Sequence, residues 1–415
     1  MHPSANEISP RLHLWRRVRE YAVPPSMIDT ATARRAVGDW AGACAAARID
    51  VEFRIREVRD RHGTDLAALL RTDLRRLAPD LLRWHMPRVA SDGRLRPRLT
   101  LTLARYGDTR LVVRTAPSRF DAPQRMSLSL WNGDGQHPHP RFRLDLHRHR
   151  WDATRSGELW KRCGAREAWP AEAELLLRDE GRRRGAFTVR LGVREYAVLE
   201  LVAPDDSHAP TLRPVAESLA PHEVAALPVL PEAATRPLPD LELLRAGLIT
   251  TDRLHPLVAA ALASEATPAG PPAVTADPHR VECRGQVHRI ALRDGVLTAV
   301  DHDPAQLRRE LLLAELGGPP LPCLRVIDKV HRSPETLPAV RERLRHGDVA
   351  GALDTVEGLL GPDAVLRDGP LLQELRSAIA DRVAHGVYRA GLTGGPRVVR
   401  LDRRARAPRR SFRSA

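Results

Sequence analysis

The sequence predicts an α+β protein, with an N-terminal helical region, a central antiparallel β-sheet with a packed helix, and a C-terminal small hairpin plus helical region. Three observations predict this class. Apolar residues recur at helical spacing before residue 92, alternate with a period of two between residues 94 and 203, and return to helical spacing after residue 303. The 415 residues, 42% of them hydrophobic, are enough for two or three domains with their own cores.

Residues 1–92 are expected to be mainly helical. The clearest helix follows Thr64, a suitable N-cap because its hydroxyl can accept a hydrogen bond from a free backbone N–H. Its leucines lie at i, i+4, i+8 and i+11 and form a single apolar stripe: Leu66, Leu70, Leu74 and Leu77. Upstream, Gly38-Asp39 interrupts an alanine-rich stretch and predicts a tight corner between two short helices.

Residues 93–203 are predicted to form one antiparallel sheet domain. Alternating apolar and polar residues predict strands at 98–103, 111–114, 126–131 and 142–149, and a hairpin of 187–191 and 195–202. A helix that begins at the cap Asp152 and ends at Gly164 would pack on this sheet.

Residues 204–278 combine a proline-rich stretch with a short helical pair. Eight prolines fall between residues 204 and 240, and because proline neither donates to a β-ladder nor continues a helix, this stretch is either a linker or a meandering cover. The helical pair, at 240–246 and 252–263, is separated by Gly247.

Residues 279–396 are predicted to be a hairpin followed by helices. The hairpin joins 280–283 to 287–292. In the next helix Asp303 is the N-cap, Pro304 occupies the first position, where its missing N–H costs nothing, and Gly317 ends the helix.

One six-residue pattern occurs twice. Gly-Asp-Trp-Ala-Gly-Ala at 38–43 matches Gly-Asp-Val-Ala-Gly-Ala at 347–352 in five of six positions. Each copy lies between an arginine-rich helix and an apolar one. The hypothesis is that both are corners of similar helix pairs; the alternative is chance in a chain rich in alanine and glycine.

Residues 345–375 resemble a degenerate ankyrin-type repeat, and no whole-chain family is identified. The residues that carry this resemblance are the corner Gly347, the paired Leu359 and Leu360, the turn at 361–363, and Asp368 with Gly369. The Thr-Pro-Leu-His signature is replaced by Gly-Pro-Leu-Leu at 369–372, and the loop is shortened. The resemblance implies a protein-interaction repeat without catalysis; an ordinary helix–turn–helix is the alternative.

The segment around residue 147 is the best metal candidate. On a strand, Asp145, His147 and His149 would share a face, as a His-x-His zinc or iron site needs. The same face would carry Arg141 and Arg143, whose charges disfavour a dication. We therefore predict no metal here, and an exposed face that contacts phosphate or nothing.

Other chemistry has weaker support. A second possible ligand set lies around the small hairpin, but its spacings match no zinc-finger pattern: Cys283, His288, His302 and Cys323. Neither Gly-x-Ser-x-Gly nor a phosphate-binding Gly-x-x-x-x-Gly-Lys motif is found, so no catalytic residue and no cofactor are predicted.

Basic charge is concentrated at the C-terminus. The formal net charge is +14, but only two basic residues are lysines, a skew typical of a GC-rich bacterial genome. Residues 397–415 carry eight arginines and one aspartate, a side-chain charge of +7, and are predicted to be a disordered tail that either contacts nucleic-acid phosphates or reflects composition alone. These arginines are Arg397, Arg400, Arg403, Arg404, Arg406, Arg409, Arg410 and Arg413.

The leading hypothesis is a cytoplasmic, non-enzymatic interaction or adaptor protein whose helix pairs contact an unknown protein partner. Scattered cysteines favour reduced thiols, and neither a signal peptide nor an apolar run long enough for a membrane span is expected. The alternative is a nucleic-acid-binding protein that contacts phosphates through the tail and a basic sheet face. The second alternative is a metal-dependent enzyme that uses the His-x-His strand.

Overall fold

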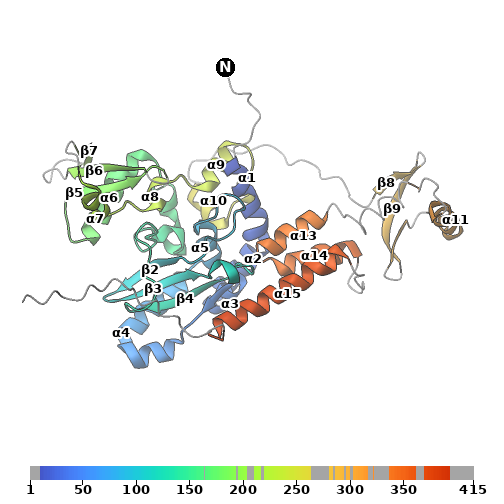
Figure 1. The fold of residues 1–415 in the computed structure, drawn as a ribbon, viewed down its shortest axis with the longest axis horizontal. Helices are drawn as coiled ribbons and strands as arrows, with labels where there is room; N and C mark the ends of the chain where they lie inside the picture. The colour runs from blue at the N-terminus through green and yellow to red at the C-terminus, as the bar shows by residue number, and fades with distance from the viewer. Residues whose placement is uncertain are drawn as a thin grey trace, which may run out of the picture.

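The computed structural model describes residues 10–162, 164–192, 195–202, 210–215, 219–262, 280–283, 286–293, 296–299, 302–315, 321, 336–360 and 369–392. These residues form a mixture of helices and small sheets, which confirms the α+β class (Figure 1).

The N-terminal region is helical, as predicted. Its α-helices are α1 (Pro10–Arg17), α2 (Pro25–Ala36), α3 (Trp40–Ala46), α4 (Ile55–Arg76) and α5 (Pro79–His85), with a π-helical turn at Val18–Ala22. The predicted leucine stripe faces inward: Leu70 and Leu74 are fully buried and Leu66 packs against the same core. Gly63 (φ 88°) kinks α4, so a new helical segment begins at Thr64, close to the predicted start.

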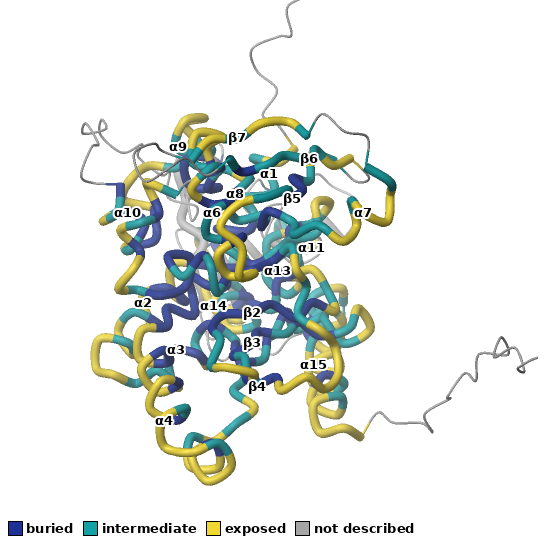
Figure 2. Tube along the Cα trace, turned by 90° about the vertical axis from the view of Figure 1, so that its left-hand side faces the viewer, coloured by how far each residue is buried: buried dark blue, intermediate teal, exposed yellow. Residues whose placement is uncertain are grey.

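The first sheet shares one core with these helices. Its strand order is β1 (Ile49–Val51), β4 (Met126–Trp131), β3 (Thr109–Thr115) and β2 (Thr100–Tyr106), and β1 runs parallel to β4 while the other pairs are antiparallel. Figure 2 shows the buried course of β2 and β3 through the middle of the molecule. Leucines from α4 and from β2 belong to one hydrophobic cluster, so no boundary between cores falls at residue 92.

The residues predicted to form one central sheet form two. A separate antiparallel sheet has the order β5 (Gly185–Arg190), β6 (Tyr196–Val202) and β7 (Thr211–Pro214). It packs with α6 (Trp169–Asp179) and α8 (Glu232–Thr235) around a core that includes Leu177 and Phe187. The predicted helix after Asp152 is a 3₁₀-helix, Ala153–Leu159, whose cap Asp152 accepts a hydrogen bond from the Thr154 amide.

The predicted strand at 142–149 is wrong. This segment is irregular and ends in a short 3₁₀-helix, Arg148–Arg150. The alternating pattern has another cause: Phe142 and Leu144 are buried, but His147 and His149 are buried as well. The alternation of apolar and polar residues here therefore reflects buried polar side chains and not a solvent-exposed face of a strand.

The proline-rich stretch is a cover and not an extended linker where it is described. α7 (Pro221–Ala226), α8, α9 (Pro239–Arg245) and α10 (Pro256–Leu262) follow one another, and Leu230, Ala234 and Leu238 are buried. A third small sheet, with the order β10 (Val296–Ala299), β9 (Gln286–Arg293) and β8 (Arg280–Cys283), precedes α11 (Pro304–Glu315). Asp303 caps α11 by accepting from the Ala305 amide, as predicted.

The last helices return to the N-terminal region. They are α13 (Thr336–Arg345), α14 (Val349–Leu360) and α15 (Pro370–Arg389), and Figure 1 shows α15 crossing below α13 and α14, near α2 and α3. Arg48, which follows α3, donates to the His346 carbonyl oxygen (2.7 Å) and to Asp348 Oδ1 (2.8 Å). Residues 300 positions apart therefore join the N-terminal helices to the corner between α13 and α14.

The repeated six-residue pattern forms the same corner twice. Gly38 and Gly347 both have positive φ (78° and 75°), which favours glycine. Each following aspartate, Asp39 or Asp348, accepts from a glycine amide three residues on and pairs with an arginine five residues back. The hypothesis of two similar helix pairs, α2–α3 and α13–α14, is confirmed, although the first corner is exposed and the second is buried.

Candidate nucleic-acid interface

Three strands place polar side chains in one row near an edge of the first sheet. Asp50 on β1 is paired with Ser127 on β4, which is paired with Arg114 on β3. Because directly paired residues on adjacent strands share a face, these three side chains lie side by side. The neighbouring positions, Val113 and Leu128, are fully buried on the opposite face and anchor the row.

The C-terminal end of α15 closes one side of this row. His385 Nδ1 lies 2.8 Å from the Phe120 carbonyl oxygen, to which it donates. The Tyr388 ring stacks on the Phe120 ring, with centroids 4.7 Å apart. The Arg119 guanidinium also lies over the Phe120 ring, 4.7 Å from its centroid. These contacts fix α15 against the loop between β3 and β4.

The sheet row, this loop and α15 enclose a hollow of about 700 Å³ that we call the arginine cleft. Its charged and hydrogen-bonding lining residues are Asp50, Glu52, Arg98, Arg114, Thr115, Ser118, Arg119, Arg125, Ser127, Gln136, His385, Tyr388 and Arg389. Five arginines thus face two carboxylates.

The arginines of the cleft differ in their partners. Arg125 binds Asp50 in a bidentate pair (2.6 and 2.9 Å), and Arg389 contacts the same carboxylate at 3.1 Å. Burial alone would raise the pKa of Asp50, but the hydrogen bonds and charge of Arg125, helped by Arg389, lower it below its usual value, so Asp50 stays ionised. In the described part of the chain no ion pair involves Arg98, Arg114 or Arg119.

Arg114 has a further feature. Its Nε is buried and has no hydrogen-bond partner among the described residues. A buried donor without an acceptor is costly, and an anion bound in the cleft would provide one. The cleft is therefore suited to oxyanions such as phosphate.

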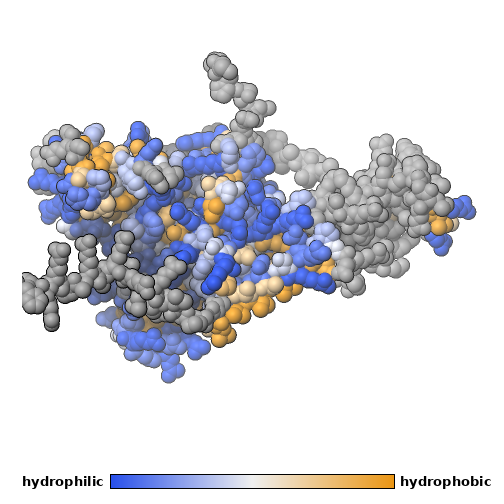
Figure 3. Space-filling model, viewed as in Figure 1, coloured by the Kyte–Doolittle hydropathy of each residue, from blue (hydrophilic) through white to orange (hydrophobic). Residues whose placement is uncertain are grey.

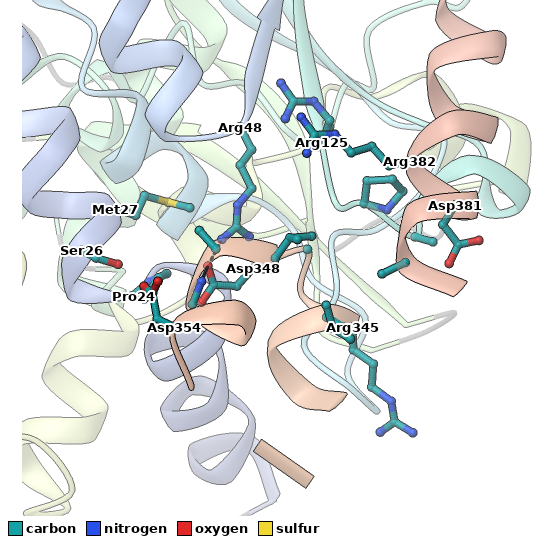
Figure 4. A pocket seen from close by; sticks show the side chains of 18 of the residues that line it. Pro24, Ser26, Met27, Arg48, Arg125, Arg345, Asp348, Asp354, Asp381 and Arg382 are labelled. Atoms are coloured by element: carbon teal, nitrogen blue, oxygen red, sulfur yellow. Dashed lines mark hydrogen bonds and ion pairs between the residues drawn. The ribbon is translucent and has the colours of Figure 1, made fainter. Parts of the chain in front are cut away.

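A second hollow, of about 550 Å³, lies beyond Arg125, which lines both (Figure 4). Here charges of both signs alternate: Arg48 points at Asp348, and Asp354, Asp381 and Arg382 also line the space (Figure 4). This mixed-charge hollow favours no single sign of ligand, so the arginine cleft is the stronger anion site.

Two of the three metal candidates lie close together, since the ring centroids of His147 and His149 are 5.7 Å apart. Asp145 pairs with Arg143 (2.9 Å) and Arg105 (3.1 Å), so its carboxylate is occupied. His147 Nε2 lies 3.0 Å from Glu172, and its Nδ1 lies 2.8 Å from the Arg143 carbonyl oxygen. No group of three metal-ligating side chains occurs among the residues that the structure describes. The expected exposed face is also wrong, since both histidines are buried.

A buried histidine–carboxylate pair elsewhere stabilises the core. His255 Nε2 donates to Asp80 at 2.7 Å, its Nδ1 accepts from the Leu257 amide, and both side chains are fully buried. Burial raises the pKa of the Cys44 thiol to about 12, which makes it unreactive. Neither arrangement offers a nucleophile to a substrate.

Several predicted residues lie outside the described part of the chain. They include the eight tail arginines from Arg397 to Arg413, Cys323, and the turn at 361–363 and Asp368 of the ankyrin-like stretch. The described chain ends at Leu392, three residues beyond Arg389, which lines the arginine cleft. No motif or periodic pattern in the sequence points to the cleft arginines, which lie at the ends of strands, in the β3–β4 loop and at the end of α15.

Among the described helices, each is too short or too polar to cross a bilayer. Comparisons of the chain with protein-family models, with curated proteins and with solved structures found no match.

Proposed function

We propose that the protein binds single-stranded nucleic acid in the arginine cleft. The observation that carries this proposal is the convergence of Arg98, Arg114 and Arg119, without carboxylate partners in the described chain, on one hollow lined also by Tyr388. Guanidinium groups neutralise backbone phosphates, and an aromatic face stacks with bases of any sequence. The arginine-rich tail would add further phosphate contacts without base readout.

The test is fluorescence anisotropy with a labelled 20-mer of oligo(dT) or oligo(U), and with a duplex of the same length, over a range of salt concentrations. The cleft variant Arg98→Gln/Arg114→Gln/Arg119→Gln should bind the single strand at least tenfold more weakly. If the variant loses three phosphate contacts, the magnitude of the slope of log K against log salt should fall by about 2, since each contact contributes about 0.7.

A matched control removes the same charge elsewhere. Arg71, Arg75 and Arg76 are exposed on α4, away from the cleft. Their triple replacement by glutamine should change affinity less than twofold. An equal loss in both triple variants, or no binding by the unmodified protein at low salt, would refute the proposal.

Deletion of residues 393–415 separates the tail from the cleft. We expect weaker binding and a shallower salt slope, with the preference for single strands retained because Tyr388 remains. If the deletion abolishes binding and the cleft variant of the full chain binds normally, the tail alone binds and the cleft does not.

An exposed apolar stripe on α15 supports the adaptor hypothesis as a second candidate function. Ile379, Val383 and Val387 lie at i, i+4 and i+8 and are 63%, 60% and 38% exposed. Figure 3 shows the corresponding hydrophobic band along this edge of the molecule. Asp381 and Arg382, both exposed beside the stripe, have no ion pair within the described chain, so we infer a partner helix with an apolar stripe and charged flanks of both signs.

This candidate is tested by photo-crosslinking from position 383 in the native host, followed by mass spectrometry of the linked peptide. The expected product is a partner peptide with that helical pattern, lost in Ile379→Asp. Leu69→Asp, on the exposed side of α4, is the control. A crosslink between position 383 and a second copy of this chain would contradict a separate partner and indicate a homodimer instead. We infer a cytoplasmic setting for either function, because Cys44 is a buried thiol that forms no disulfide.

A further inference from the structure

An apolar chamber of about 310 Å³ lies between α1, the segment after α5, and α8–α9, and shares no lining residue with the arginine cleft. Its buried walls come from the core of the first sheet and its neighbours: Met86, Leu101, Phe142 and Leu144. Leu14 and Trp15 of α1 and the prolines at positions 10, 87, 237 and 239 extend these walls. Charged side chains also line the chamber: Arg11, Arg88, Arg150, Glu232 and Arg236. The chamber therefore favours a compact ligand with an apolar body and a charged group.

The chamber adjoins a polar hollow of about 450 Å³. The two share Pro87, Arg88, Ala90, Phe142, Glu232 and Arg236. Five arginines line this polar mouth, against one carboxylate, Glu232: Arg88, Arg96, Arg141, Arg190 and Arg236. Glu232 already pairs with Arg141 and Arg236. In the described part of the chain Arg96 has no ion pair, so the mouth keeps an excess of positive charge.

His85 gives the chamber a hydrogen-bonding group. Its Nδ1 lies 3.0 Å from the Arg150 carbonyl oxygen and must donate to it, so Nε2 is left as an acceptor. This Nε2 is buried and has no partner among the described residues. Burial, then the charge of Arg150, holds the pKa of His85 well below its usual value, so the ring stays neutral. A donor on a bound molecule would satisfy Nε2.

We propose that this chamber and its mouth form a binding site for a small amphipathic anion. The apolar body would occupy the space between Trp15, Leu101 and Phe142. Its carboxylate, sulfonate or phosphate would face the arginines of the mouth. Because the walls come from α1, the first sheet and α8–α9, the bound ligand would contact three parts of the fold at once.

The probe is 8-anilinonaphthalene-1-sulfonate, which joins an aromatic body and an N–H donor to a sulfonate. Fluorescence titration of the full chain should give one saturable site. Uncharged N-phenyl-1-naphthylamine, which lacks the sulfonate, should bind at least tenfold more weakly. Competition by decanoate or by 1-naphthyl phosphate then distinguishes an aliphatic from an aromatic body.

Variants locate the bound probe. Ala90 is exposed and lines both hollows, so Ala90→Trp should block entry without disturbing the core and abolish binding. Arg96→Glu should weaken binding of the sulfonate but not of the neutral dye. Ala68→Trp and Arg71→Glu, both on exposed positions of α4, are the matched controls and should change neither. Binding retained in Ala90→Trp, or equal affinity for both dyes, would overturn the proposal.

Discussion

Arg83 joins three segments from a position with no solvent exposure. Its guanidinium donates to the carbonyl oxygens of Ala22 (3.0 Å), Ala47 (3.4 Å) and Gln124 (2.7 Å). A buried cation held by carbonyl oxygens alone is sensitive to the loss of any contact, and burial with the nearby Arg48 lowers its pKa well below the usual value.

We expect Arg83→Met to lower the free energy of unfolding by about 3 kcal/mol, because three carbonyl groups lose a charged donor in the core. Urea unfolding followed by circular dichroism measures this change. Arg71→Met, on the exposed face of α4, should alter stability by no more than about 0.5 kcal/mol. Equal values for the two variants would show that Arg83 is not a structural link.

His346 predicts an acid-dependent loss of stability. Burial, followed by the charges of Arg88 and Arg83, lowers its pKa to about 3 in the folded protein, against about 6.5 when unfolded. Between these pH values the unfolded chain binds the extra proton, so stability falls as pH decreases, by up to about 1.4 kcal/mol per pH unit. Unfolding measured from pH 4 to 7 should show a slope shallower by one proton in His346→Gln. An unchanged slope would contradict the burial of this ring.

The repeated glycine–aspartate corner gives a matched comparison at the scale of elements. A Cβ on Gly38 would meet no atom within 4 Å, whereas a Cβ on Gly347 would lie 2.1 Å from the Pro123 carbonyl oxygen. Gly38→Ala should therefore cost only the left-handed backbone strain, about 1 kcal/mol. Gly347→Ala should cost at least about 2 kcal/mol more, because α13–α14 must move away from the β3–β4 loop. Urea unfolding of both variants measures these costs. Equal losses in the free energy of unfolding would mean that the corner at Gly347 does not pack against the β3–β4 loop.

The sequence predicts these elements unevenly, for physical reasons. Caps and glycine corners are local, so Asp303, Gly347 and the leucine stripe of α4 were predictable from a few residues. The strand at 142–149 was not, since buried ion pairs imitate the polar half of an alternating strand. β1 has three residues, too few for a periodic pattern, and its pairing with β4 is what places Asp50 beside Ser127 and Arg114. The cleft depends on this register, which no local pattern contains.

At the scale of the whole molecule, Arg48 connects the N-terminal helices to α13–α15. Its side chain is 12% exposed and pairs with Asp348. Burial lowers the pKa of Arg48 to about 10, so it remains charged at neutral pH. We expect Arg48→Met to loosen the C-terminal helices while the β5–β6 pair, in a separate core, is unaffected. Hydrogen exchange should show faster exchange at Ala352 and Val356 in α14 but unchanged exchange at Phe187 and Val189. Uniform acceleration would instead mean that the molecule unfolds as one unit.

The arginine cleft contains Asp50 from β1 and Arg389 from α15, so its walls lie near opposite ends of the described chain. During synthesis, the sheet row from Asp50 to Arg114 leaves the ribosome long before α15 does. The cleft is therefore complete only after residue 389 has emerged, and at about 5–20 residues per second the interval after the sheet row is tens of seconds. A nascent chain that has not reached α15 would carry the arginine row without the Tyr388 wall, and the nucleic-acid binding proposed above would begin only once α15 has folded against the row.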